Sequence, residues 1–446
     1  MQNNILGKEK ILNLFIKFTV PAIIAMLING MQTIIDGIFL GNFVGPNAMA
    51  SVNLVQPFNQ VIVGSATIMS TGALSFIGRS LGEGEIKKSQ NIFKTSLLVL
   101  ISVSLFISIM GVSFSDKIAL ALGSNDVLLE SVSTYIKTIS IFATPIALMF
   151  LCGFVDRVIE RPDLYLKGSV LSLFTNICLN YVLIKVLQLG IKGAAIATGV
   201  SFTVAFLVVS TPFFNKKSTL NIFKGKFDKS TILPVIYNGS SEGAISLSIA
   251  TNAYIFNMVF MKIAGENGIA AFTSISYIAQ VTTLLMFGIS DGIGPIISYN
   301  YGYKKFDRVN KTLEISYKFI LGIGITLFLV LFFNGGDLVK LFAGSNKEVL
   351  DLAVSGSKLY AFAFLMSGFN IVYSGYFTFI GYAKESVLIA LFRGTIFVVV
   401  GIMIFPQLMG IPGVWLTVPF AELMTIILGT LMMRKNQTEI INTVAA

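Results

Sequence analysis

The chain has 446 residues, of which 54% are hydrophobic and only 12% are charged, and its formal net charge is +10. A soluble domain carries about 25% charged residues, so this composition excludes a soluble globular fold and predicts an integral membrane protein. The chain has no histidine, which excludes histidine proton relays, histidine zinc sites and Ser-His or Cys-His catalysis.

Apolar runs recur along the chain, and each is long enough to cross a hydrocarbon core of roughly 30 Å as a helix. Such continuous runs differ from the alternating pattern of a membrane barrel. We therefore expect an all-α integral membrane protein. Its twelve transmembrane helices are predicted at residues 14–41, 48–77, 95–115, 131–155, 168–187, 193–214, 232–262, 268–300, 316–336, 353–380, 386–405 and 412–433.

Pro21, Pro57 and Pro295 fall inside the longest spans and are the expected bend points, because proline removes a helical hydrogen bond. Most of the 32 Lys and Arg residues fall in alternate connections, together with the chain ends. The positive-inside rule therefore predicts that both termini are cytoplasmic, in a multi-pass protein of the plasma membrane, here the cytoplasmic membrane of a bacterium. This bias explains the net charge, so we expect contacts with membrane lipid and no nucleic-acid partner.

The two halves of the sequence match at a constant offset of 220 residues. The matched pairs include Gly45/Gly265, Asn47/Asn267, Gln60/Gln280, Gly72/Gly292, Gly82/Gly302 and Gly190/Gly410. Matched glycines and amides in order indicate a duplication, which is typical of membrane transporters. We expect an N-terminal lobe at 1–214, a basic cytoplasmic linker at 215–231 and a C-terminal lobe at 232–446, with the two lobes related by a pseudo-twofold axis.

Asp36 is the first candidate for chemistry inside a span. A carboxylate at the bilayer centre costs about 2.5–3.5 kcal/mol, and no Lys or Arg of the first span lies near enough to neutralise Asp36. Asn29 and Gln32 precede it at spacings of 3 and 4, so the three side chains share one helical face. We interpret Asp36 as functional and Gln32 as a neighbour that lines a cavity.

Other polar residues follow the same helical spacing. Asn53, Gln56 and Gln60 form such a set in the second span, and Asn176 and Asn180 are an i, i+4 pair in the fifth. Three helices could therefore direct polar stripes toward one another. The simpler alternative is interhelical hydrogen bonding, by which Asn and Gln hold membrane helices together.

Three acids and one amide are the candidates in the second half. Glu242, in NGSSEGAIS near the start of span seven, could line a substrate cavity, cap the helix or face the interface. Asp291 precedes the repeat-matched Gly292 and could bind substrate, as could Gln280. Glu422, in the last span, could instead hold a neighbouring helix.

The sequence resembles the multidrug and toxic compound extrusion (MATE) family over nearly its whole length. The first-span segment QTIIDGIFLGNFVG is similar to the family's Asp-containing signature, and GPIISYNYG and GVWLTVPFAEL resemble its MepA-like branch. The resemblance implies two six-helix lobes around a central cavity and cation-driven antiport. It also implies a first-lobe cation site for H⁺ or Na⁺ at Asp36, Asn176, Asn180 and Thr198. Many relatives have Asp where Asn180 stands, which leaves Asp36 as the one acid of that site.

We therefore expect a secondary antiporter that exports amphipathic, cationic organic compounds and needs no cofactor besides its coupling ion, H⁺ or Na⁺. Asp36 is the residue expected to bind it, and we expect the protein to be a monomer. The alternatives are a flippase for lipid-linked precursors, which would need a cationic cavity, and a membrane enzyme or sensor without transport. No GxxxxGK[ST] loop is present in the sequence, so ATP-driven transport is not expected.

Overall fold

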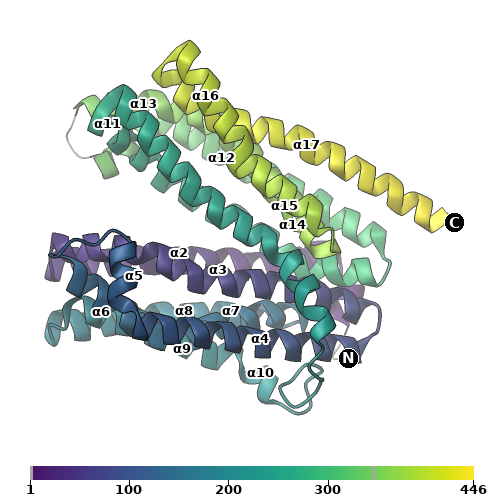
Figure 1. The fold of residues 1–446 in the computed structure, drawn as a ribbon. Helices are drawn as coiled ribbons and strands as arrows, with labels where there is room; N and C mark the ends of the chain where they lie inside the picture. Colours follow the sequence, from purple (N-terminus) through teal and green to yellow (C-terminus); the bar gives the residue numbers. More distant parts are fainter. Residues whose placement is uncertain (1–3, 344–346, 446) are drawn as a thin grey trace.

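The computed structural model describes residues 4–343 and 347–445, and these residues are almost entirely helical. Figure 1 shows two groups of helices, here called the first lobe (α2–α9) and the second lobe (α11–α17), which converge near the chain ends and diverge away from them. The first-lobe helices are α2 (Ile11–Phe43), α3 (Pro46–Gly82), α4 (Ile86–Ser113), α5 (Ser115–Ala121), α6 (Leu129–Ile141), α7 (Ala143–Val158), α8 (Pro162–Asn180), η1 (Tyr181–Val186) and α9 (Gly190–Val209).

The short helices α1 (Ile5–Lys8) and α10 (Thr211–Phe214) flank the first lobe. After a segment without α-helix and the turn η2 (Lys229–Thr231), the second lobe begins. Its helices are α11 (Ile232–Gly302), α12 (Phe306–Ala343), α13 (Lys347–Tyr360), η3 (Ala361–Ala363), α14 (Phe364–Ile380), α15 (Ala383–Leu391), η4 (Phe392–Ile396), α16 (Phe397–Met409) and α17 (Ile411–Ala445).

Twelve spans are present in the described part of the chain. Ten helical segments are long and apolar enough to cross a membrane, and the pair α6 and α7 makes an eleventh. The twelfth arises because α11 is broken at Gly265, whose φ of 60° and ψ of −152° are not helical. The prediction of twelve helices in two lobes is therefore confirmed. The chain ends, which the positive-inside rule places in the cytoplasm, lie outside the described residues.

One detail of the predicted spans was wrong. The span at 131–155 is two helices that meet at an angle of 51° next to Phe142. Pro145 lies in the first turn of α7 and lacks the N–H that would bond the Ile141 carbonyl, so the helix is interrupted there. The helices α2, α3 and α11, by contrast, continue through Pro21, Pro57 and Pro295, and bending at these three prolines stays a prediction.

Matched glycines of the repeat occupy matched places in the two lobes. Gly45 (φ 121°) and Gly265 (φ 60°) form the turns after the first span of each half, where positive φ favours glycine. Gly82 and Gly302 touch across the lobes, because a Cβ on Gly82 would lie 3.1 Å from the carbonyl carbon of Gly302 and 2.1 Å from the Tyr299 carbonyl oxygen. These pairs preserve the turns and the close contact where the lobes converge.

The peptide group of Leu6 joins the two lobes. Its N–H donates to Glu160 Oε1 at 3.1 Å, in the connection between α7 and α8 of the first lobe. Its carbonyl accepts from Asn300 Nδ2 at 3.0 Å and Arg308 Nη2 at 2.9 Å, both in the second lobe. Helix α1 therefore bridges the lobes at the end where they converge.

Candidate functional site

A hydrogen-bonded cluster surrounds Asp36 inside the first lobe. Asn176 Nδ2 and Asn180 Nδ2 donate to Asp36 Oδ1 at 3.0 and 2.6 Å, and Thr198 Oγ1 donates to Asp36 Oδ2 at 2.8 Å. The carboxylate is 7% exposed, and both asparagines are fully buried. The structure thus brings together the four residues that the family resemblance singled out, from α2, α8 and α9.

Local geometry explains how α8 presents its two amides. Asn176 and Asn180 lie one turn apart, and Asn180 Nδ2 also donates to Asn176 Oδ1 at 3.1 Å. Directly after Asn180 the helix widens into the π-helical turn η1, a feature that is frequent at functional sites. One turn before Asp36, Gln32 Nε2 donates to Ser172 Oγ at 2.9 Å, which fixes α2 against α8.

The donor pattern suits an ionised carboxylate, because all three partners of Asp36 donate hydrogen bonds to it. No ion pair compensates the charge among the residues that the structure describes. Asn180 Oδ1 is buried and has no hydrogen-bond partner in the structure. Rotation of that amide would present an oxygen to Asp36, so the cluster has the donor atoms for either a proton or a sodium ion.

The other polar candidates of the first half lie outside this cluster. Asn53 and Gln60 on α3 are exposed and Gln56 is half-buried. Gln280, the repeat partner of Gln60, is exposed as well. The structure brings together the polar side chains of α2 and α8. The polar side chains of α3, Asn53, Gln56 and Gln60, make none of the hydrogen bonds described above.

A pocket in the second lobe holds all three remaining acidic candidates, Glu242, Asp291 and Glu422. It comprises about 1180 Å³ of empty space, including open solvent. It lies between helices α14–α17 and the two segments of α11 on either side of Gly265. Glu242 lies well inside α11, whose N-cap is Thr231, so the capping interpretation of Glu242 is wrong. Small polar and aromatic side chains alternate along the walls, including Ser248, Asn252, Phe287 and Ser374.

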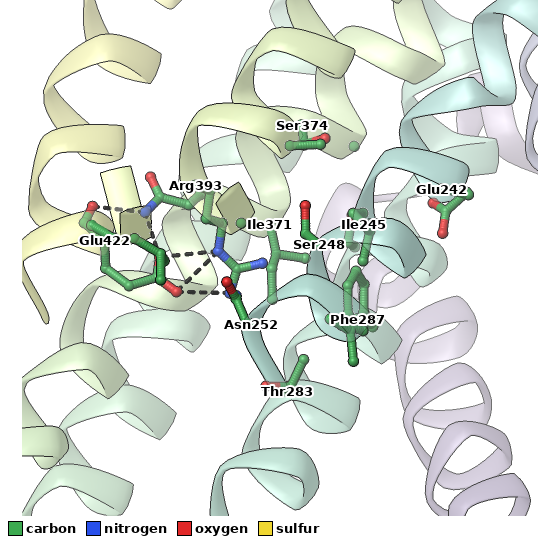
Figure 2. Close-up of a pocket in the computed structure, with 18 of the residues that line it drawn as sticks. Glu242, Ile245, Ser248, Asn252, Thr283, Phe287, Ile371, Ser374, Arg393 and Glu422 are labelled. Atoms are coloured by element: carbon green, nitrogen blue, oxygen red, sulfur yellow. Dashed lines mark hydrogen bonds and ion pairs between the residues drawn. The ribbon is translucent and has the colours of Figure 1, made fainter. Parts of the chain in front are cut away.

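One end of this pocket is closed by a buried ion pair. Arg393 Nη2 lies 2.8 Å from Glu422 Oε1, and Arg393 Nε contacts both Glu422 oxygens at 3.0 Å. Asn370 Nδ2 donates to Glu422 Oε2 at 2.6 Å. Figure 2 shows Glu242 on the opposite side of the pocket from this pair. Glu422 therefore joins three helices, as its alternative interpretation suggested.

Sequence reasoning missed Arg157 as a site residue. Arg157 falls just after the predicted span 131–155, where a connection is expected. Its side chain is nevertheless 1% exposed and lies between the rings of Phe154 and Tyr165, 4.6 and 4.5 Å from their centroids. Arg157 Nη1 is 3.5 Å from Asp291 Oδ2, so the pair connects the lobes. A signal was present in the sequence, since Arg157 comes three residues after Phe154, close to the end of an apolar run with aromatic residues.

The second lobe has no counterpart of the Asp36 cluster at the repeat-matched positions. Asp36 matches Phe256, which stacks on Phe272 with a centroid distance of 4.8 Å. Asn176 matches Ile396 and Asn180 matches Val400. Apolar side chains replace the polar ones at these positions, and the two lobes are therefore chemically different.

Comparisons with known proteins extend these observations. A sequence model of the MatE family matches residues 21–182 and 244–404. The Multidrug export protein MepA of Staphylococcus aureus (strain bovine RF122 / ET3-1) is 24% identical over 418 residues, covering 93% of this chain and 92% of that protein. A crystal structure of MATE in the bent conformation is similar with a TM-score of 0.92, 21% identity and 99% coverage of each chain. An outward-facing multidrug resistance MATE family transporter is similar with a TM-score of 0.91, 21% identity and 99% coverage of each chain.

Proposed function

Because this chain belongs to the multidrug and toxic compound extrusion (MatE) family of transporters, we propose that it is a secondary antiporter that exports amphipathic organic cations. Its relatives are named multidrug export proteins, and their similarity extends over most of the chain. The driving force is an inward gradient of H⁺ or Na⁺. The protein works as a monomer in the plasma membrane, with the converged end of the lobes toward the cytoplasm.

The observation that carries this proposal is the Asp36 cluster. In the present conformation, three donors hold the carboxyl group of Asp36, an arrangement that suits its ionised form. Arrival of a cation neutralises that charge. Loss of the charge removes the electrostatic cost of enclosing Asp36 away from water, and this favours closure of the lobes at the end where they now diverge.

The chemistry of the second-lobe pocket supports substrate binding there. Aromatic and hydroxyl side chains line it, which suits a flat amphipathic compound. A flippase for lipid-linked precursors would need excess positive charge for a pyrophosphate. Arg393 is paired with Glu422, so this pocket has no such excess.

Transport by purified protein in proteoliposomes, with H⁺ and Na⁺ gradients imposed separately, tests the proposal. We expect one of the two gradients to drive export of ethidium. The variant Asp36→Asn should lose gradient-driven export, whereas the exposed-site control Asp337→Asn should retain it. Export that is equal with and without either gradient would contradict antiport.

A further inference from the structure

Four acidic or basic side chains line the second-lobe pocket, and three of them are paired with opposite charges of the protein. Glu422 and Arg393 form a bidentate pair 2.8 Å apart. Asp291 is paired with Arg157 of the first lobe at 3.5 Å. The fourth is Glu242, whose carboxylate has no ion pair or hydrogen bond within residues 4–343 and 347–445.

We propose that Glu242 is the specificity-determining residue of this pocket and that it selects singly charged organic cations. This inference rests on the proposed export function and adds the substrate charge to it. The pocket carries one formal negative charge that no protein group balances. A ligand with one positive charge restores neutrality when water is displaced, whereas a neutral ligand leaves the carboxylate buried and uncompensated.

The arrangement of the pocket fixes how such a ligand would lie. Glu242 and the Arg393–Glu422 pair stand on opposite sides, with Ile245, Ser248 and Phe287 between them (Figure 2). The charged group of a cation would face Glu242, and its aromatic body would extend along the mixed polar and apolar wall. A second positive charge on the ligand would reach toward Arg393, where the acid is already engaged.

Glu242 also differs from the structural acids of this chain. Asp291 connects the lobes and Glu422 connects helices, so substitution of either changes packing as well as charge. Glu242 holds no other helix through a hydrogen bond or ion pair in the described part of the chain. Its replacement should therefore change ligand preference without unfolding the protein.

Three phenanthridine dyes with different charges provide the test: ethidium with one positive charge, propidium with two, and neutral dihydroethidium. Binding is measured by fluorescence on the purified full-length protein. For the wild type, we expect ethidium to bind about tenfold or more tightly than dihydroethidium, as for gain of a charge-assisted contact, and propidium to gain no further affinity.

In the variant Glu242→Gln, the affinity for ethidium should fall to the affinity for dihydroethidium. The affinity for dihydroethidium itself should be unchanged, which shows that the pocket is intact. Glu242→Asp should keep the preference for ethidium.

A matched control is Glu314→Gln, because Glu314 is an exposed acid paired with Lys311 and Lys318 outside the pocket. An undiminished preference for ethidium in Glu242→Gln would overturn the role of Glu242. If the wild type exports ethidium but binds all three dyes equally, the charge inference fails and the export function stands. If the wild type neither binds nor exports ethidium, both proposals are contradicted.

Discussion

Asp36 depends on neighbours that differ in how replaceable they are. Asn176 and Asn180 both donate to one carboxylate oxygen, so each is partly backed up by the other. Thr198 is the donor described for the second oxygen, at 2.8 Å. Thr198 therefore contributes most independently to the position and charge of Asp36.

We expect Thr198→Val to weaken coupling, because valine keeps the shape of threonine and removes the hydroxyl. A hydrogen bond to a charged group is worth about 1.5–3 kcal/mol, so the concentration of coupling ion for half-maximal export should change by roughly tenfold or more. Thr198→Ser should restore the wild-type value. An unchanged ion dependence in Thr198→Val would show that the hydroxyl has no part in the site.

The pair Arg393 and Glu422 makes a prediction about stability. Their side chains are 17% and 7% exposed, so removing one partner leaves a buried charge. Glu422→Leu alone should destabilise the protein by about 3–5 kcal/mol, whereas Glu422→Leu combined with Arg393→Met should recover most of that loss. Thermal unfolding in detergent measures both variants. An equal loss in the single and the double variant would contradict the account of the pair.

Sequence alone located part of these sites. Asp36, Asn176 and Asn180 could be found because helical spacing and the family signature both indicate them. Arg157 and the open charge of Glu242 could not, because their roles depend on partners more than 100 positions away in the chain, or on the lack of one. Spacing along a helix describes a face, and it does not describe what packs against that face.

At the scale of the elements, glycine sets the distance between helices of the two lobes. Helix α3 packs against α11, and a Cβ on Gly82 would lie 2.1 Å from a backbone oxygen of α11 that has little freedom to move. Gly64 lies on the same helix, and a Cβ there would meet nothing within 4 Å. A comparison of alanine at Gly82 with alanine at Gly64 therefore separates the effect of close packing from the effect of helix propensity.

We expect Gly82→Ala to disfavour the present conformation by about 1–3 kcal/mol, because the converged ends of the lobes must move apart. Distances between spin labels on α3 and α14 measure the shift in population. Gly64→Ala is the control and should leave the distances unchanged. Identical distance distributions in both variants would show that the glycine contact does not determine the arrangement of the lobes.

Helix α1 should respond to pH through Glu160. Burial raises the pKa of Glu160 above its ordinary value of 4.5, and the backbone bonds from Leu6 and Ile5 oppose this only in part. Glu160 therefore binds a proton more tightly when α1 is docked against it than when α1 is undocked. Docking is favoured below the ordinary pKa, and this contribution is lost as the pH rises through the raised pKa. Hydrogen exchange of the Leu6 amide should slow as the pH falls toward that range, after correction for intrinsic exchange. Glu160→Gln should abolish this dependence, and a dependence that persists would assign it to another group.

Sequence predicted the spans better than their interruptions. Length and hydrophobicity define the extent of a span, so all twelve were located. The bend next to Phe142 arises from one missing proline N–H, and the break in α11 from the φ of one glycine. Pro21, Pro57 and Pro295 carry the same sequence signal, yet the helices continue through them.

At the scale of the whole molecule, the duplication preserved the frame and the chemistry diverged. Gly82 and Gly302 meet where the lobes converge, while Asp36 and its repeat partner Phe256 lie in a polar cluster and an aromatic stack. We therefore propose a division of work, in which the first lobe binds the coupling ion, the second binds the organic cation, and movement of the lobes links the two events.

The most direct test of this division is ethidium export from proteoliposomes under an imposed ion gradient, measured for wild type, Asp36→Asn and Glu242→Gln. We predict that Asp36→Asn binds ethidium normally and loses gradient-driven export. Glu242→Gln should lose ethidium affinity while the dependence of its remaining export on the ion gradient stays as in wild type. Wild-type export by Asp36→Asn, or loss of ethidium affinity in Asp36→Asn with none in Glu242→Gln, would contradict the account.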